Sequence, residues 1–585
     1  MDKEINRIRI NRLYSESNIF NEIIFHDGVN LILGEKFDDA TVVGRKTNGV
    51  GKSMSIEFLD FCFLNDYNDS RIKKIPDNIV PMEEDIALDL EIGQNQITIK
   101  RNRKNEATPQ LVRNGKQVSF EKLSDARNYL AELVFNNLNG NDVPSFRNIL
   151  SILMRDERSE FIDILKCHEL TKSIPIDLTS HLFILGLSIE SYQKTVKTIK
   201  EIETLTKVIT KNKNDLTDGN KKKIADVQAE LNSLDDELEK MESAIESFKS
   251  NEAFDSIEKD LLELENALDQ LRKKQKVLRY EYDKIKRLPK PEEIDDIEIE
   301  LVYNQFKSDL GSAIVKSLNE VVGFKNKVEE FQRMLINQKA HELEAQLNEI
   351  AERIRVLDNE YSEKLKIIDT KGVLKNLKTS LKIYENKKDA CAHTKFLFDE
   401  YEKNNKRKKT LSLRKSQEIM EIDELLEKNK SIIKDFIATI LDIHEDIMGN
   451  KECSFSVQTV DKAKNKIPVE ISMRIFDDGS HSVNRTKVFI YDMALMFNEH
   501  TRNRHPLFLV HDNIFDVDQD TLVQCLNYLA KQEEKYQNFQ YVLTLNRDKI
   551  ENEERAKLIK MVVDSHMVAT FTKENKFLKK NYQEK

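Results

Sequence analysis

Apolar residues recur at alternating spacings of three and four along the middle of the chain. They are Ile224, Val227, Leu231, Leu234, Leu238, Met241, Ile245 and Phe248, then Leu261, Leu264, Leu268 and Leu271, and later Leu343, Leu347, Ile350, Ile354, Leu357 and Tyr361. Charged residues fill the positions between them. This is the a/d pattern of a coiled coil, and bundle helices packed on a globular core are the alternative interpretation.

Helix-breaking residues are sparse over the same stretch. Between Pro175 and Pro468 the only prolines are Pro289 and Pro291. Breakers this rare permit two long helical arms with one interruption between them. We therefore predict an antiparallel coiled coil over residues 189–440, with a hinge near residues 286–342. Such a fold-back brings the two ends of the chain together.

The two ends have a different pattern, with short β-rich runs separated by helical ones. The runs that predict strands are residues 6–10, 29–33, 86–92, 97–101, 455–460, 469–475, 507–510 and 541–545, and a hairpin is expected near residues 111–116. Residues 1–188 and 441–585 are therefore expected to be mixed α/β lobes, while the middle of the chain is helical.

Composition narrows the class of protein. Charged residues make up 34% of the 585 residues, the formal net charge is −10, and the five cysteines form no CxxC pair. A zinc site or a disulfide scaffold is therefore not expected, and a reducing cytoplasm fits the chain. No apolar run is long enough to cross a bilayer, so we expect no membrane partner.

One glycine-rich segment predicts a phosphate-binding loop. The segment Asn48, Gly49, Val50, Gly51, Lys52, Ser53 and Met54 follows a strand-like run and opens a helical pattern. Glycines let backbone N–H groups converge on phosphates, and a helix N-terminus favours an anion. We expect ATP here, with Lys52 at the β- and γ-phosphates and Ser53 on Mg²⁺. Lys46 replaces the first glycine of the consensus, and a chance match without nucleotide is the alternative.

A second acidic group is expected at the end of a buried strand, where it holds the magnesium shell. The run Leu507-Phe508-Leu509-Val510-His511-Asp512 fits, although a plain strand ending in a turn aspartate is the alternative. One sheet holds both Lys52 and Asp512 only if the chain between them folds back. Asn513 follows Asp512, at the position where P-loop ATPases of this kind that hydrolyse ATP usually have Glu. A carboxamide is a poor base. Hydrolysis is therefore expected either to be slow or to use Asp516 or Asp518 downstream.

With these motifs, the chain resembles the SMC-like branch of ABC-type ATPases. The resemblance implies an ABC-type P-loop head built from both chain termini, joined by a long antiparallel coiled coil, and ATP held between two engaged heads. It places signature-segment roles on Ser480, Ser482 and Asn484, although Ser482 as a helix N-cap is an open alternative. It also places Asp156 where the family has its Q-loop glutamine, and Asn546 where it has the switch histidine.

The chain also resembles the SMC-like subunit of Lamassu-type, three-component ABC defence systems of bacteria. The absence of a CxxC hook separates it from the coiled-coil ATPase of double-strand-break repair. This resemblance implies a homodimer that senses foreign double-stranded DNA ends and controls an effector nuclease subunit, together with a small accessory subunit. Two alternatives stay open: a DNA-repair ATPase of the same architecture, and a structural coiled-coil protein that binds ATP without consuming it.

Two basic runs are candidate contacts to DNA phosphates. One contains Arg101 and Arg103, and the other is Lys406, Arg407, Lys408 and Lys409. Affinity for DNA follows such local patches even in an acidic protein. A solvated charged face is the alternative for each run. No aromatic residues interleave with the basic ones, so sequence-specific readout is not expected.

Overall fold

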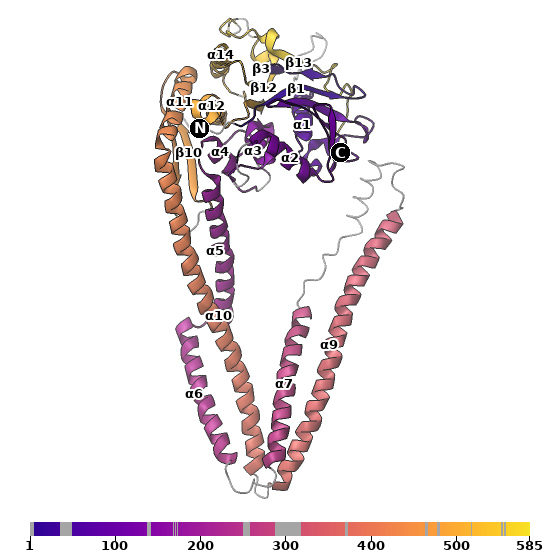
Figure 1. The fold of residues 1–585 in the computed structure, drawn as a ribbon, viewed down its shortest axis with the longest axis vertical. Helices are drawn as coiled ribbons and strands as arrows, with labels where there is room; N and C mark the ends of the chain where they lie inside the picture. The colour runs from indigo at the N-terminus through magenta and orange to yellow at the C-terminus, as the bar shows by residue number, and fades with distance from the viewer. Residues whose placement is uncertain are drawn as a thin grey trace. The chain divides into compact units, whose positions relative to one another are not determined.

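The computed structural model describes residues 5–35, 49–136, 138, 142–167, 169, 171, 174–249, 258–286, 318–368, 373–461, 466–476, 480–515, 517–551, 554 and 557–584. The chain divides into two compact units (Figure 1). The head unit comprises Met1–Lys200 and Leu413–Lys585, and the helical unit comprises Glu201–Ser412. Both ends of the chain therefore belong to one unit. Asn48 and Asp516 lie outside the described residues.

A parallel sheet forms the centre of the head unit, in the order β13-β3-β12-β11-β8. Its strands are β3 (Gly28–Gly34), β8 (Met154–Arg155), β11 (Phe508–Asp512), β12 (Gln540–Asn546) and β13 (Met567–Phe571). Leu31 pairs with Leu543, and Val510 pairs with Val542. Strands buried on both faces have continuous apolar runs, as β3 and β11 do. The prediction that both ends of the chain build one sheet is confirmed.

The second sheet of the head unit is antiparallel, and its described strands have the order β2-β1-β4-β5-β6-β7. The bounds are β1 (Ile8–Ser15), β2 (Ile23–Ile24), β4 (Ile86–Ile92), β5 (Asn95–Arg101), β6 (Gln110–Arg113) and β7 (Lys116–Ser119). Alternate residues of β5 are buried, as in a sheet with one face on a core. Arg113 pairs with Lys116 across the predicted hairpin.

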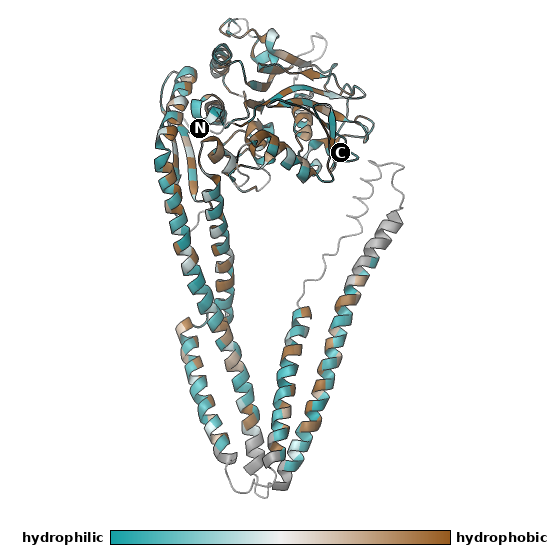
Figure 2. Ribbon diagram, viewed as in Figure 1, coloured by the Kyte–Doolittle hydropathy of each residue, from teal (hydrophilic) through white to brown (hydrophobic). Residues whose placement is uncertain are grey.

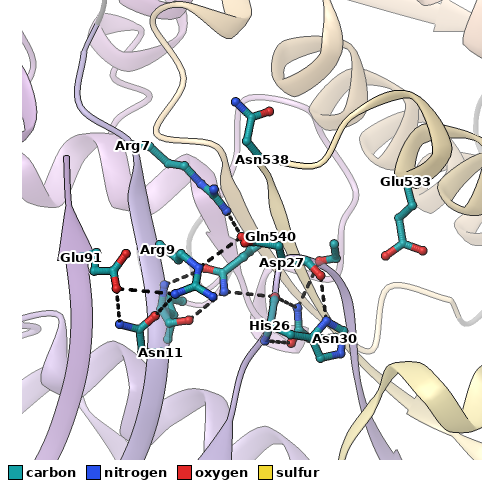
Figure 3. A network of polar contacts seen from close by, with 12 residues as sticks. Arg7, Arg9, Asn11, His26, Asp27, Asn30, Glu91, Glu533, Asn538 and Gln540 are labelled. Carbon is teal, nitrogen blue, oxygen red and sulfur yellow. Dashed lines mark hydrogen bonds and ion pairs between the residues drawn. The ribbon is translucent and has the colours of Figure 1, made fainter. Parts of the chain in front are cut away.

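Gln540 of β12 ties the two sheets together (Figure 3). Its side-chain oxygen accepts the N–H of Ile10 at 2.6 Å, and its amide nitrogen donates to the carbonyls of Ile10 at 2.7 Å and His26 at 3.1 Å. Glu533 accepts the N–H of Val29 at 2.6 Å. These bonds join residues more than 500 positions apart in sequence, so the head unit is closed by specific polar contacts as well as by its core.

Helices and a hairpin complete the head unit. The helices of the head unit include α1 (Lys52–Cys62), α2 (Leu123–Phe135), α3 (Phe146–Leu153), α4 (Thr179–Ile184), α11 (Lys430–Met448), α12 (His481–Phe497), α13 (Glu499–Arg502) and α14 (Gln519–Lys535). Short 3-10 turns are η1 (Tyr67–Asp69), η2 (Arg71–Lys74), η3 (Glu157–Ser159), η6 (Arg547–Lys549) and η7 (Val563–His566). β9 (Cys453–Thr459) and β10 (Val469–Ile475) form the hairpin.

A buried charge network lies under the end of β11. Arg155 of β8 pairs with Asp492 of α12 at 2.7 Å, and His511 of β11 contacts Asp492 at 3.0 Å and the Tyr541 hydroxyl at 3.0 Å. Burial alone would raise the pKa of Asp492, but the adjacent Arg155 guanidinium lowers it below its ordinary value. His511 therefore packs in this buried network beside Asp512.

The described helices of the middle region are α5 (Ile189–Leu216), α6 (Ile224–Lys249), α7 (Glu258–Lys286), α9 (Leu318–Ile368) and α10 (Val373–Lys428). Apolar residues recur along these otherwise hydrophilic helices (Figure 2). Lys364 pairs with Asp260, and Arg272 with Asp358, so α7 and α9 run in opposite directions. None of the described helices is both long and apolar enough to span a membrane.

The predicted seam residues are buried in small clusters. One contains Ile245, Leu261, Leu268 and Tyr361, and the other contains Val227 and Leu231 with Cys391 and Phe398 of α10. One prediction was wrong: the arm is interrupted by a turn at residues 217–223, where Asp218, Gly219 and Asn220 have positive φ. Of the proposed hinge near 286–342, residues 287–317 lie outside the described residues and 318–342 are part of α9.

Candidate nucleotide site

The predicted phosphate loop leads directly into α1. Gly49 has φ +82°, and Gly51, the N-cap of α1, has φ +106°, a conformation that L side chains rarely adopt. A Cβ on Gly51 would also lie 2.6 Å from the Cβ of Phe577. No side chain caps the first turn of α1 in the described structure. A helix N-terminus without a side-chain cap is suited to binding an anion such as a phosphate.

Lys52 projects from this turn toward the end of β12. Its ammonium group donates to the side-chain oxygen of Asn546 at 2.5 Å. Burial lowers the pKa of Lys52, while the carboxylates of Asp512 and Glu157 act in the opposite direction. Lys52 and Asp512, from opposite ends of the sequence, thus lie in one electrostatic environment.

Asp512 ends β11 and is 2% exposed. It accepts hydrogen bonds from the Thr544 hydroxyl, at 2.5 Å, and from the Ser53 hydroxyl. Burial raises the pKa of Asp512 to about 6. A hydroxyl and a carboxylate side by side form the hard oxygen donor set that Mg²⁺ prefers, so the residues present fit the predicted metal.

Asn513 begins the turn after β11 in a left-handed conformation, with φ +61°. Its backbone N–H donates to Thr544 Oγ1 at 2.9 Å, and its carbonyl accepts from Arg485 of α12 at 2.6 Å. Its side-chain amide donates to Glu157 Oε1 at 3.3 Å. The backbone of Asn513 is therefore held by β12 and α12, and its carboxamide contacts Glu157 at the edge of the site.

A cavity of about 400 Å³ opens over the loop. Its lining is Gly49, Val50, Gly51, Lys52, Ser53, Met54, Arg71, Glu157, Asn513, Lys576, Phe577, Leu578, Lys580, Tyr582 and Glu584. The segment 576–584 is attached to the loop, since the Phe577 N–H donates to the Val50 carbonyl at 3.1 Å. Arg71 donates to Glu584 at 2.5 Å. The volume fits a nucleotide-sized ligand.

A smaller cavity of about 210 Å³ lies beside the magnesium candidates and includes Ser53, Asp512, Asp156 and Glu157. Asp156 caps η3 by accepting the Arg158 N–H at 3.0 Å, and it also forms an ion pair with the Arg158 side chain. Arg158 bridges to Glu57 of α1 at 3.1 Å. Asp156 therefore lies near the site, with its carboxylate engaged by Arg158.

The signature-like residues lie at the start of α12. Ser480 is the N-cap, and its hydroxyl accepts the Val483 N–H at 3.2 Å, so Ser480 rather than Ser482 caps this helix. The Ser482 hydroxyl accepts the Asp518 N–H at 3.4 Å. Ser480, Ser482 and Asn484 do not line the two cavities of their own chain in the described structure. Their predicted contact with a nucleotide on a second copy stays a prediction.

Three charged residues have different positions from those expected. Asp518 caps α14, where its carboxylate accepts from Thr521, so it does not face the site. Arg101 and Arg103 are each 2% exposed, and their guanidinium groups donate to backbone carbonyls, including those of Phe61 at 2.6 Å and Val80 at 2.7 Å. The prediction that these arginines contact DNA was wrong, because they hold loops of the head unit. Lys406–Lys409 lie on α10 and remain candidates.

The sequence interpretation missed Glu157, Arg71 and the segment 576–584. Glu157 and Arg71 lie in short 3-10 turns among other charged residues, and the segment follows the last predicted strand. No periodicity or motif marks any of them. Only the parallel pairing of β8 with β11 predicts that residues after Arg155 approach Asn513, and β8 has two residues.

Comparison with known proteins gives limited matches. The model of a family described as an uncharacterised protein conserved in bacteria (DUF2326) matches residues 443–581. No curated protein matches the chain. Two solved structures are similar over the head and the coiled coil together. The Smc head domain with a coiled coil and joint from Pyrococcus yayanosii is 12% identical, with a TM-score of 0.32, and covers 92% of each chain.

The second structure is the Smc head domain with an extended coiled coil bound to the C-terminal domain of ScpA, from Pyrococcus furiosus. It is 10% identical, with a TM-score of 0.34, and covers 93% of this chain and 91% of its own. Likeness at this level does not say which residues act in the site.

Proposed function

We propose that this chain is an SMC-like ATPase, which binds ATP and Mg²⁺ in its head unit and hydrolyses the nucleotide. Two copies engage through their heads, and engagement responds to double-stranded DNA ends and controls an effector nuclease and a small accessory subunit in bacterial anti-phage defence. The observation that carries the proposal is the proximity of Lys52, Ser53 and Asp512, from both ends of the chain, at two cavities that share Ser53 beside the uncapped N-terminus of α1.

The residues divide the work by their chemistry. The N–H groups of Gly49–Ser53 bind phosphate oxygens, and Lys52 neutralises the β- and γ-phosphates. Asn546 orients the Lys52 ammonium group through its 2.5 Å hydrogen bond. Ser53 and Asp512 would hold the metal, which when bound supplies positive charge against the phosphates. Asn513 and Glu157 face the same cavity and are placed to orient water.

The engagement of two heads is supported by the position of the signature-like residues, which do not line the described cavities of their own chain. Ser480, Ser482 and Asn484 lie at the start of α12 but outside the described lining of their own cavities. A helix N-terminus is a ready phosphate site, so these residues are suited to the γ-phosphate on a second copy. DNA contact is supported by Lys406–Lys409, of which Lys406, Arg407 and Lys409 are exposed on α10. The defence role depends on the sequence resemblance alone.

The Lys52→Ala variant tests nucleotide binding. Removing the ammonium group leaves the phosphate charge without its partner, which costs about 2–5 kcal/mol, a loss of affinity between about 30-fold and about 4,000-fold. Calorimetric titration of ATP with Mg²⁺ into the full chain measures this loss. Lys451→Ala, at an exposed lysine paired with Asp442 and Glu445, is the matched control and should bind as the parent does. Undiminished affinity in Lys52→Ala would contradict the proposal.

The response to DNA is tested by ATP turnover with linear and with closed circular duplexes of the same sequence. We expect linear DNA to change turnover and circular DNA to have little effect. A second candidate function is a structural protein that holds ATP without consuming it, and the amide at Asn513 favours it. Tight ATP binding with no phosphate release under any of these conditions would select that second candidate.

A further inference from the structure

The proposed site lacks a basic side chain at the position after Asp512, where a general base is expected. Hydrolysis requires a group that accepts a proton from the attacking water. Asn513 follows Asp512 at this position, and its side chain offers an amide that donates and a carbonyl that is a poor base. A carboxylate from another element must take that role if the chain turns ATP over.

The other carboxylates near the site are already committed or lie elsewhere. Glu584 of the large cavity pairs with Arg71, and Asp60 of the smaller cavity pairs with Arg147. Asp512 is buried against Ser53 and Thr544 and belongs to the metal position. Asp156 pairs with Arg158, and Glu57 accepts from Ser70, Arg71 and Arg158. Asp518 caps α14. Each has a structural partner, and Asp518 lines neither cavity.

Glu157 differs from all of these. It lines both the large cavity over the phosphate loop and the smaller one beside Ser53 and Asp512. Its side chain is exposed, and within the described parts of the chain no cation is paired with its carboxylate. Its one described side-chain partner is the Asn513 amide, at 3.3 Å. Its negative charge also acts on Lys52, where it favours the protonated ammonium group and so opposes the lowering of the Lys52 pKa by burial.

The fold explains why Glu157 is there. β8 pairs with β11 in parallel, with Met154 beside Val510 and Arg155 beside His511. Continuing that register by two residues brings Glu157 alongside Asn513 at the carboxyl edge of the sheet. Arg155 is anchored beneath by its buried ion pair with Asp492. The position of Glu157 is therefore set by the sheet itself.

We propose that Glu157 is the catalytic base of ATP hydrolysis, an inference that rests on the proposed function. Its carboxylate accepts a proton as the water oxygen bonds to the γ-phosphorus, and the bond from that phosphorus to the β,γ-bridging oxygen breaks. ADP leaves with the bonding electron pair. The proton then passes from Glu157 to the released phosphate or to solvent. Asn513 is a positioning residue, whose amide holds the carboxylate toward the water.

The first test is Glu157→Gln in the full chain, with linear DNA present and absent. Loss of a general base lowers turnover by about 10²–10⁴-fold, so we expect at least the lower figure, with calorimetric ATP affinity within about twofold of the parent. Glu160→Gln is the matched control, since Glu160 is exposed three residues away and lines neither cavity. It should turn over ATP at the parental rate.

The second test moves the carboxylate. In the double variant Glu157→Gln and Asn513→Glu, the acid returns to the position after Asp512, and we expect turnover at least about tenfold above that of Glu157→Gln. A purely structural role for Glu157 predicts no such rescue. Parental turnover in Glu157→Gln overturns the inference, as does a parent that binds ATP but releases no phosphate. If Lys52→Ala binds ATP normally, the proposed function itself fails, which separates the two outcomes.

Discussion

The head unit and the helical unit bury their apolar residues in different ways. In the head unit, one continuous cluster joins both sheets with the helices around them, and residues such as Val510 and Leu543 are 0% exposed. In the helical unit, the buried seam residues form small separate clusters and are 1–9% exposed, while other described seam residues are partly exposed. Many ion pairs between its helices are half-exposed. A substitution in the core of the head unit should therefore affect the whole unit. A substitution in a seam of the helical unit should affect only the helices that pack at that seam.

The largest expected effect in this comparison is at the buried ion pair of the head unit. Asp492→Asn leaves the fully buried Arg155 guanidinium without its counter-charge, which costs about 3–5 kcal/mol. Denaturant unfolding of the head, followed by tyrosine fluorescence, measures the change. Asp446→Asn, at an exposed pair with Lys531, is the control and should cost less than about 1 kcal/mol. A loss of less than about 1 kcal/mol at Asp492 would show that the buried network relaxes easily.

An intermediate effect is expected at the seam of the helical unit. Leu268 packs with Ile245, Leu261 and Tyr361, so Leu268→Ala should destabilise α7 and α9 by about 2 kcal/mol, at the low end for buried leucines. Hydrogen exchange should speed up in α7 and α9 while ATP affinity stays unchanged. The same change at Leu509 of β11, 1% exposed, should reduce ATP affinity as well. If Leu268→Ala and Leu509→Ala changed ATP affinity equally, the proposed difference between a coupled head unit and locally packed seams would be contradicted.

The smallest effect is expected at an exposed ion pair between helices. Lys387 pairs with Glu237, and the two side chains are 39% and 48% exposed. Lys387→Met should change the stability of the helical unit by less than about 1 kcal/mol, because exposed pairs gain little against solvent and lose side-chain freedom. Thermal unfolding followed by helical circular dichroism checks this. A larger loss would mean that ion pairs, rather than the apolar seam, hold these helices together.

The fold was predictable where a pattern repeats or a motif has fixed spacing. The heptads of α6, α7 and α9 and the apolar run that ends at Asp512 gave the helices and the central strand in advance. The turn at Gly219 was missed, although Asp218-Gly219 is a turn signal, because the arm was predicted to start at residue 189, whereas the heptad pattern begins only at Ile224. Arg101 and Arg103 were misread because a basic run does not show which guanidinium groups face carbonyls inside the head.

The site was predictable only in part for a related reason. Lys52, Ser53 and Asp512 belong to local motifs, and their meeting follows from the fold-back of the chain. Glu157 reaches Asn513 through the register of two strands, and the segment 576–584 reaches Gly51 through the packing of Phe577. Such contacts between distant residues leave no periodic trace in a sequence. They depend on tertiary structure.

The central sheet also limits when the head can fold during protein synthesis. Lys52 and Asn546 are 494 residues apart, and β3 lies between β12 and β13. At about 5–20 residues per second, a ribosome needs roughly 25–100 s to pass from one to the other. Over that interval the emerging β3 has neither neighbour, and its unpaired apolar edge is open to association with other nascent chains. Any factor that covers this edge during synthesis therefore protects the first lobe until the last one has been made.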